Sequence, residues 1–341
     1  MSKDLNSIYR GVVEGVADPL KLGRVQIRVF GVHTPLKEKS SGGRDGVPTA
    51  ELPWALPANP IAEGSVSGFG VWAVPVQGSH VYVFFENGNP STPVYFASVG
   101  GQPINPPDTK KGFNDPDGVY PLKHRLNQPD MHRLARGESS DTIVTAKNAS
   151  TDKNVKTGDG STWSEPNSSY NAKYPDNLVI ATHGGNIIEL DSTPGKERIH
   201  IFHSSNSYIE IDVDGNMVIR NNKDKYEIVL GGKNIHVKDN LNETTDGNKS
   251  VRVEGNDTAI VNKNRKSTID GNDDKILNGN DTQTVGGSLT INVTGSVNVT
   301  GGVVTIDGGG GSINGVVTGD CICALTKKPH IQCSSSVKAS M

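Results

Sequence analysis

Residues 247–294 read GNKSVRVE-GNDTAIVN-KNRKSTID-GNDDKILN-GNDTQTVG-GSLTINVT, a run of eight-residue units closed by Gly295. Glycine opens every unit except the third, where Lys263 stands, and asparagine follows the opening residue in the first five. An apolar residue lies two positions before each boundary: Val253, Val261, Ile269, Leu277, Val285 and Val293. A fixed period of this kind predicts a repetitive β-structure.

The octads are too short to enclose a core within one chain. Gly and Asn tolerate positive φ, so each Gly-Asn pair predicts a corner, and the alternation between corners directs one apolar side chain inward. One octad is about 26 Å long when extended, whereas a prism closed by a single chain needs roughly 15 or more residues per turn. We therefore predict an intertwined homotrimeric, triple-stranded β-helix. The alternative, a disordered Gly/Asn-rich tract, has no reason to keep Val, Ile and Leu in register.

The composition fits an elongated β-protein. Only 33% of the 341 residues are hydrophobic and 5% are aromatic, against 40 glycines. The net charge of −3 gives no sign of a nucleic-acid or membrane-surface partner. There is neither an apolar run of about 18 residues nor an apolar signal-peptide core, so we expect assembly in a cytoplasm.

The first hundred residues predict a second kind of β-structure. Short strand-like runs separated by turn signals lie at 12–13, 25–29, 70–76, 80–85 and 94–99. Such a series within residues 1–100 suits an OB-type barrel. An OB barrel that binds nucleic acid needs a basic groove, but acidic residues offset Lys21, Arg24 and Arg28. These acidic residues are Glu14, Asp18, Glu51, Glu63 and Glu86. We therefore expect no nucleic-acid partner.

Part of this barrel sequence resembles a known family. Residues 11–33 read GVVEGVADPLKLGRVQIRVFGVH, and ELPWA (51–55), PVQGSHVYVFF (75–85) and PVYFASVGG (93–101) follow. These segments resemble the central spike proteins of contractile-tailed phages of the T-even type, to which the VgrG proteins of type VI secretion systems are related. The loop at residues 18–24 is the most specific part. The resemblance implies a barrel that trimerises and docks the spike into the baseplate hub.

Residues 101–177 are rich in Pro, Ser and Asn, which predicts a linker or a lateral loop wrapping the trimer, with one short helix at 130–136. Some members of the family carry a lysozyme domain here. A glycosidase needs two positioned carboxylates, one of them in an apolar pocket. Glu138, Asp141, Glu165 and Asp176 lie in polar sequence. We therefore predict that the lysozyme domain is absent and that the chain is not an enzyme.

Strand patterns resume at residue 178, and we assign 178–320 to the spike. The predicted strands are 178–182, 186–190, 198–202, 208–211, 216–219 and 226–230. Their alternation marks core candidates: Ile187, Ile199, Ile201, Ile209 and Ile211. Residues 212–215 resemble a calcium loop but lack the later ligands, so they predict a β-turn. His200 and His203 fall on opposite faces of one strand, which indicates packing or surface residues.

The last segment, 321–341, contains all three cysteines. Cys321 and Cys323 lie on one face of a strand, and His330 and Cys333 follow a proline. On a three-fold axis these soft ligands suit zinc or iron, and some spike tips of this wider class bind an axial metal. The alternative is that the cysteines are small apolar fillers of a narrowing core.

Taken with the resemblance, these patterns predict the trimeric central spike of a phage contractile tail, located in the virion baseplate. Its expected partners are two further copies, baseplate hub proteins, the tail tube, a PAAR-like tip protein and the host outer envelope. Sheath contraction would drive the spike through that envelope. Two alternatives are a cell-wall hydrolase within 101–178 and a VgrG-type spike of a bacterial secretion system.

Overall fold

The computed structural model describes residues 5–38, 46–61, 63–102, 129–138 and 152–304. Within these ranges the regular structure is β-strand and short 3-10 turns, with no α-helix, as the all-β prediction requires. None of the described segments forms a helix that could cross a membrane. The chain divides into two units between Val251 and Arg252, and each is considered by itself.

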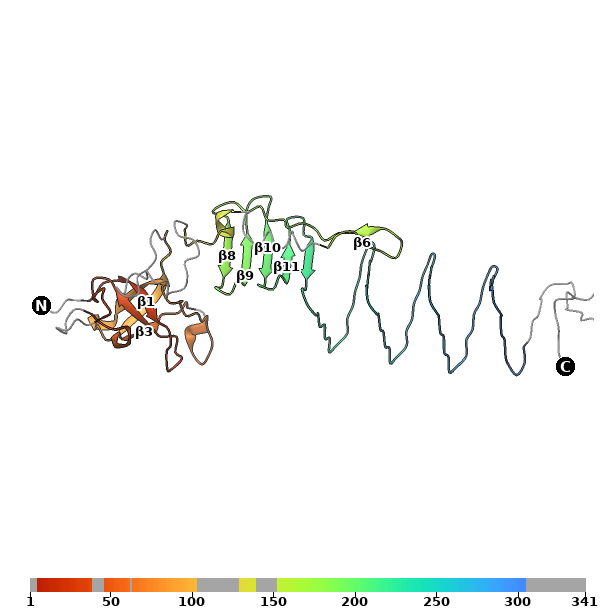
Figure 1. The fold of residues 1–341 in the computed structure, drawn as a ribbon, viewed down its shortest axis with the longest axis horizontal. Helices are drawn as coiled ribbons and strands as arrows, with labels where there is room; N and C mark the ends of the chain where they lie inside the picture. Colours follow the sequence, from red (N-terminus) through yellow and green to blue (C-terminus); the bar gives the residue numbers. More distant parts are fainter. Residues whose placement is uncertain (1–4, 39–45, 62, 103–128, 139–151, 305–341) are drawn as a thin grey trace, which may run out of the picture. The chain divides into compact units, whose positions relative to one another are not determined.

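The N-terminal strands close into a barrel. They are β1 (Tyr9–Gly15), β2 (Val25–Val29), β3 (Trp54–Pro57), β4 (His80–Phe85) and β5 (Pro93–Ser98), in the order β1-β2-β3-β5-β4 (Figure 1). All pairs are antiparallel except β3 with β5. The buried interior consists of Leu5, Val13, Val25, Ile27, Val29, Ala55, Val81, Val83, Phe85 and Tyr95. This closed barrel confirms the predicted OB-type architecture.

One predicted strand of the barrel is wrong and one was missed. Residues 70–76 have a strand-like sequence but belong to no strand, and the fifth strand of the barrel is β3. β3 is only four residues long, begins directly after Pro53 and ends at Pro57, which hides it from a periodicity search. The sequence pattern of residues 70–76 shows that apolar residues are present, but it cannot show whether a neighbouring strand is available to pair with them.

A buried ion pair fixes the loop after β2. The guanidinium of Arg28 donates to both carboxylate oxygens of Glu14, at 2.7 and 3.0 Å, and both side chains are fully buried. Arg28 also donates to the carbonyls of Thr34, Leu36 and Val47. The pair is therefore saturated with hydrogen bonds, which a buried charge requires.

Thr49 completes this network, since its Oγ1 donates to Glu14 Oε2 at 2.8 Å. Thr49→Val should lower the free energy of unfolding of the barrel by about 1.5–3 kcal/mol, the usual value of a hydrogen bond to a charged group. Urea unfolding followed by Trp54 fluorescence measures the change. Thr49→Ser keeps the hydroxyl and serves as the control; equal losses in both variants would contradict the assignment.

The loop at residues 18–24 is braced by one carboxylate. Asp18 accepts hydrogen bonds from the backbone N–H groups of Leu20, Leu22 and Arg24 and from the Arg24 guanidinium. The Arg24 side chain, joined by these backbone donors, holds the pKa of Asp18 well below its usual range. Arg24 and Arg28 are thus both engaged in ion pairs, with Asp18 and Glu14 respectively.

His33 makes the barrel sensitive to acid. Its Nδ1 accepts a hydrogen bond from the Val29 backbone N–H at 2.9 Å, so the ring must be neutral. Burial, helped by the nearby Arg28 charge, lowers the pKa of His33 below 6.5. The unfolded chain therefore takes up a proton before the folded chain does, and stability should fall as the pH drops below about 6.5. Urea unfolding between pH 7.5 and 5 tests this. His33→Asn cannot titrate and should flatten the dependence; an unchanged slope would contradict it.

Five more strands form an antiparallel meander. They are β8 (Asn177–Ala181), β9 (Ile187–Asp191), β10 (Arg198–Phe202), β11 (Tyr208–Ile211) and β12 (Met217–Arg220), each paired with the next (Figure 1, green). A separate two-stranded ribbon joins β6 (Val155–Lys156) to β7 (Thr162–Trp163). The predicted turn at 212–215 is confirmed, since Asp212 Oδ1 accepts from the N–H groups of Asp214 and Asn216 and Gly215 has φ of 81°.

The predicted helix at 130–136 is reduced to a single 3-10 turn, Leu134–Arg136, which ends at Gly137 with φ of 75°. Seven residues are too few to recover the cost of nucleating an α-helix. The buried Leu134 instead joins the core beneath the sheet, together with Ile187, Phe202 and Tyr208.

Beyond β12 the backbone changes from a sheet to a zigzag. Bends recur every eight residues, at 254–255, 262–263, 270–271, 278–279, 286–287 and 294–295 (Figure 1, teal to blue). The same spacing begins upstream of the predicted octads, with bends at 230–231, 238–239 and 246–247. The predicted strand at 226–230 is wrong for the single chain, because these residues are extended but pair with no neighbour.

Candidate functional site

The five-stranded sheet carries one face made of apolar rows. The register aligns Ile180, Ile188, Ile201, Ile209 and Ile219 side by side across all five strands. A parallel row contains Leu178, Leu190, Ile199, Ile211 and Met217. We call these ten residues the apolar face. A shift of one residue in the strand register would move all of these apolar side chains to the other face of the sheet. The observed register therefore gathers them on one face, as a packing surface requires.

The apolar face is open to solvent in the isolated chain. Eight of its members are among the exposed large hydrophobic residues of the chain, and Ile209 and Ile211 are half-buried. Soluble monomers rarely expose a contiguous apolar patch of more than a few hundred Å². The apolar face is therefore expected to be covered by another protein surface.

The opposite face of the sheet has the reverse chemistry: it is charged and buried. Arg198 donates to Glu210 Oε2 at 2.6 Å and also to Glu189 Oε2. Asn177 Nδ2 donates to Glu189 Oε1 at 2.7 Å, and the ring of His200 packs against those of Phe202 and Tyr208. Burying charges while exposing isoleucine is the opposite of what a free sheet does in water.

The charged and polar neighbours of Glu189 determine its ionisation. Burial acts to raise the pKa of Glu189, but His200, Arg198 and Asn177 outweigh it, so the pKa lies below the ordinary carboxyl value. Glu189 is therefore held as a carboxylate, matched by the Arg198 cation. Buried charges of this kind are tolerated only when paired and hydrogen-bonded.

Residues 165–177, the covering segment, lie against the charged face. Glu165 accepts hydrogen bonds from the Tyr208 hydroxyl and the Arg220 guanidinium. The Tyr170 hydroxyl donates to the Leu134 carbonyl at 2.8 Å, and the Arg198 guanidinium lies over the Tyr170 ring. The covering segment thus shields one face of the sheet with the same chain and leaves the apolar face free.

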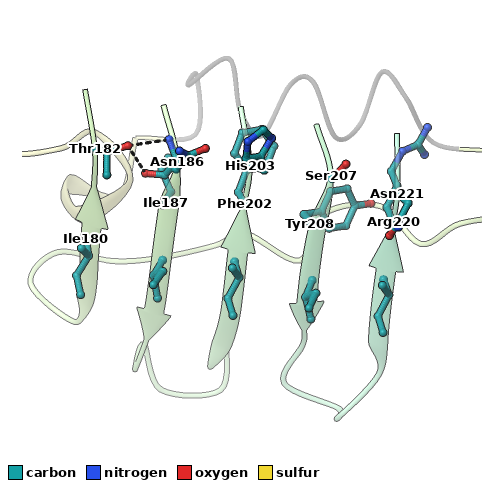
Figure 2. A pocket seen from close by; sticks show the side chains of 14 residues that line it. Ile180, Thr182, Asn186, Ile187, Phe202, His203, Ser207, Tyr208, Arg220 and Asn221 are labelled. Carbon is teal, nitrogen blue, oxygen red and sulfur yellow. Dashed lines mark hydrogen bonds between the residues drawn. The ribbon is translucent and has the colours of Figure 1, made fainter. Parts of the chain in front are cut away.

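A hollow of about 490 Å³ adjoins the isoleucine row at the end of the sheet (Figure 2). Polar side chains border it, among them Thr182, Asn186, His203, Ser207 and Asn221. Thr182 and Asn186 hydrogen-bond to each other across the β8–β9 turn. These residues continue the alternation of the strands and form a third, polar row beside the apolar face.

The zigzag, like the apolar face, has groups that are not covered within the chain. Within the described part of the chain, residues 223–304 make no backbone-to-backbone hydrogen bond. Their apolar side chains are exposed, including Val253, Val261, Ile269, Leu277, Val285 and Val293. An extended backbone with unpaired polar groups is a template for pairing with other chains.

The predicted core residues are only partly brought together. Ile199, Ile201, Ile209 and Ile211 share the apolar face, but Ile187 lies on the opposite face and is buried there. The register of β9 explains this, because Ile188 and Leu190, not Ile187, align with Ile201 and Ile199.

His200 and His203 separate as predicted. His200 is buried on the charged face, whereas His203 follows the end of β10 and borders the hollow. Among the described residues no group of His, Cys, Asp and Glu side chains could hold a metal ion. Cys321, Cys323, His330 and Cys333 lie outside the described residues. A zinc or iron site at the tip stays a prediction, which metal analysis of the purified protein with and without Cys-to-Ser changes would test.

Three of the four carboxylates considered as catalytic candidates are described, and of these Asp176 is exposed whereas the other two form ion pairs. Glu138 pairs with Arg133 and Arg136, and Glu165 pairs with Arg220. Neither is a lone carboxyl group in an apolar pocket, which a glycosidase acid requires. Asp141 lies outside the described residues.

Comparison with known proteins supplies the context for this surface. Residues 31–178 match the family described as the Gp5 N-terminal OB domain. Over these residues the chain is similar to Gp5 proteins. It is 33% identical over 269 residues to protein Gp5 of Vibrio phage KVP40, a match that covers 70% of this chain and 63% of that protein.

A second Gp5 protein shares a shorter segment. The pre-baseplate central spike protein Gp5 of Enterobacteria phage T4 is 36% identical over 157 residues, covering 44% of this chain and 26% of the T4 protein. The chain therefore spans less than two thirds of the length of either relative. These matches confirm the resemblance to the central spike proteins of T-even-type phages that the barrel motifs indicated.

Proposed function

We propose that the chain is the homotrimeric central spike of a phage contractile-tail baseplate. One observation carries this proposal: the same chain has an uncovered apolar face and a zigzag whose described backbone groups make no backbone-to-backbone hydrogen bond. The relationship to Gp5 proteins supports the baseplate as the place where the spike works.

Three copies satisfy the geometry better than two. Two sheets could bury their apolar faces against each other, but a pair of zigzags would still leave strand edges open. Three zigzags that each supply one face of a prism close the hydrogen bonding around the axis and leave no long free edge. The octad length of about 26 Å per chain suits one face with its corner.

The mechanism is mechanical. The barrel would dock into the hub, and the shaft would transmit the force of sheath contraction to the host envelope. Stiffness would come from interchain backbone hydrogen bonds around a dry stripe of Val, Ile and Leu. Small β-branched and glycine residues have few rotamers to order when the shaft forms.

The mass of the full-length protein in solution tests the proposal. Light scattering at neutral pH should give three times the 36.2 kDa of one chain, and the trimer should resist SDS without boiling. A monomer at neutral pH would overturn the reading. Zymography on peptidoglycan tests the enzymatic alternative, and we expect no clearing band.

A further inference from the structure

The barrel also has an apolar segment without a partner. Val71, Trp72 and Val74 are 53%, 53% and 50% exposed. Neighbours in an extended chain point to opposite sides, so both sides of residues 70–76 are uncovered. No charged side chain occurs between residues 69 and 79.

This segment is held in place and is not a frayed end. Val13 and the turn at 78–79 exchange backbone hydrogen bonds, at 2.8 and 2.9 Å, and the Gln77 side chain donates to the Glu14 carbonyl at 2.7 Å. At the other end, the Phe69 N–H donates to the Val66 carbonyl. Residues 70–75 themselves make no backbone-to-backbone hydrogen bond in the described chain. The barrel thus presents a fixed apolar segment with free backbone groups.

The same barrel presents an aromatic surface on the outside of β4 and β5. Tyr82 stacks on Phe96 with ring centroids 6.0 Å apart, and the centroid of the Phe84 ring lies 6.1 Å from that of Phe96. All three rings are exposed to a comparable degree. We call Tyr82, Phe84 and Phe96 the aromatic patch. Aromatic side chains of this kind are enriched where proteins meet.

We propose that residues 71–74 of one barrel pack against the aromatic patch of a neighbouring copy. The inference rests on the proposed trimer, because three barrels joined to one shaft stay at high local concentration. A contact between two different patches repeats around a three-fold axis and closes, which covers both surfaces on every copy. Neither surface contains a Lys, Arg, Asp or Glu side chain, so the match is apolar on both sides.

Photo-crosslinking of the full-length protein tests this contact. Trp72 is replaced by p-benzoylphenylalanine in chains labelled with ¹⁵N and assembled with unlabelled chains that carry the same replacement. After irradiation, mass spectrometry should find mixed-isotope products that join residue 72 to peptides within residues 80–98. The control places the same photo-reactive residue at Trp163, another exposed indole, and should not label residues 80–98 of another copy.

Phe96→Ser in the chain with the photo-reactive residue 72 should remove most of the mixed-isotope product, since the receiving ring is gone. Crosslinks that stay within one chain, or that reach other copies only outside residues 80–98, would overturn the inference. The solution mass separates the two proposals. A trimer that lacks the 72-to-80–98 product refutes the barrel contact alone, whereas a monomer refutes both.

Discussion

Ile201→Asp is expected to abolish the trimer. Ile201 occupies the middle of the isoleucine row, between Ile188 and Ile209. In three closed sheets the substitution would bury three unpaired carboxylates near one axis. Each isolated buried charge costs several kcal/mol, which together exceeds the stability of a typical domain. Light scattering and SDS resistance of the full-length protein measure the loss.

Val213→Asp is a matched control. In the isolated chain, Val213 is 45% exposed and Ile201 is 46% exposed, so solvent contact alone predicts equal effects. Val213 lies in the β11–β12 turn, off the apolar face, and its variant should assemble normally. Trimer formation by Ile201→Asp, or equal impairment of both variants, would contradict a buried apolar face.

Arg198→Met should destabilise the spike by about 3–5 kcal/mol, the usual cost of removing one partner of a buried ion pair. The substitution leaves Glu189 and Glu210 buried without their shared cation, because the Arg198 side chain contacts both carboxylates and is itself buried. Thermal unfolding followed by circular dichroism measures the change. Arg252→Met removes an equivalent cation from an exposed pair with Glu254, where the expected cost is at most about 1 kcal/mol.

The pH dependence of Arg198→Met should also change sign. In the natural chain the lowered pKa of Glu189 adds stability above the unfolded carboxyl pKa, and this contribution is lost as the pH falls. Without Arg198, burial should raise the pKa of Glu189, so the stability deficit should grow as the pH rises through the carboxyl range. The variant should therefore lie closer to the natural protein at pH 4.5 than at pH 7.5. A deficit that is the same at both pH values would show that lost packing, and not uncompensated charge, is responsible.

Periodicity predicted the repeated parts of this chain well. The bends fall at the octad boundaries, even where Lys263 replaces glycine. Among the described residues of this region none has positive φ, so the predicted need for a left-handed backbone at the Gly-Asn corners is not confirmed. The barrel followed from alternation and turn signals. β3 could not be predicted because four residues are too few to show a clear alternation. Residues 70–76 show that a strand-like sequence does not form a strand unless another strand is available to pair with it.

Alternation could not assign the two faces of the five-stranded sheet. The sequence of β9 alternates Ile187, Glu189 and Asp191 with Ile188 and Leu190, and simple patterning places the charges outside. The structure buries these charges because the covering segment places Glu165 and Tyr170 against the same face. A polar segment looks like a linker by composition, and only its packing shows that it covers charges.

The bend spacing has a consequence for how three chains find their alignment. Successive octads are nearly equivalent, so one shaft could slide along the others by eight residues and still present glycine to glycine and valine to valine. The five-stranded sheet does not repeat, and each chain forms its hydrogen bonds unaided. In the proposed trimer, three preformed sheets would therefore meet in a single alignment, and the zigzags would then pair octad by octad toward the C-terminus. In the proposed trimer the sheet would set the alignment of the zigzags, and a chain without the sheet would be expected to pair its octads out of register.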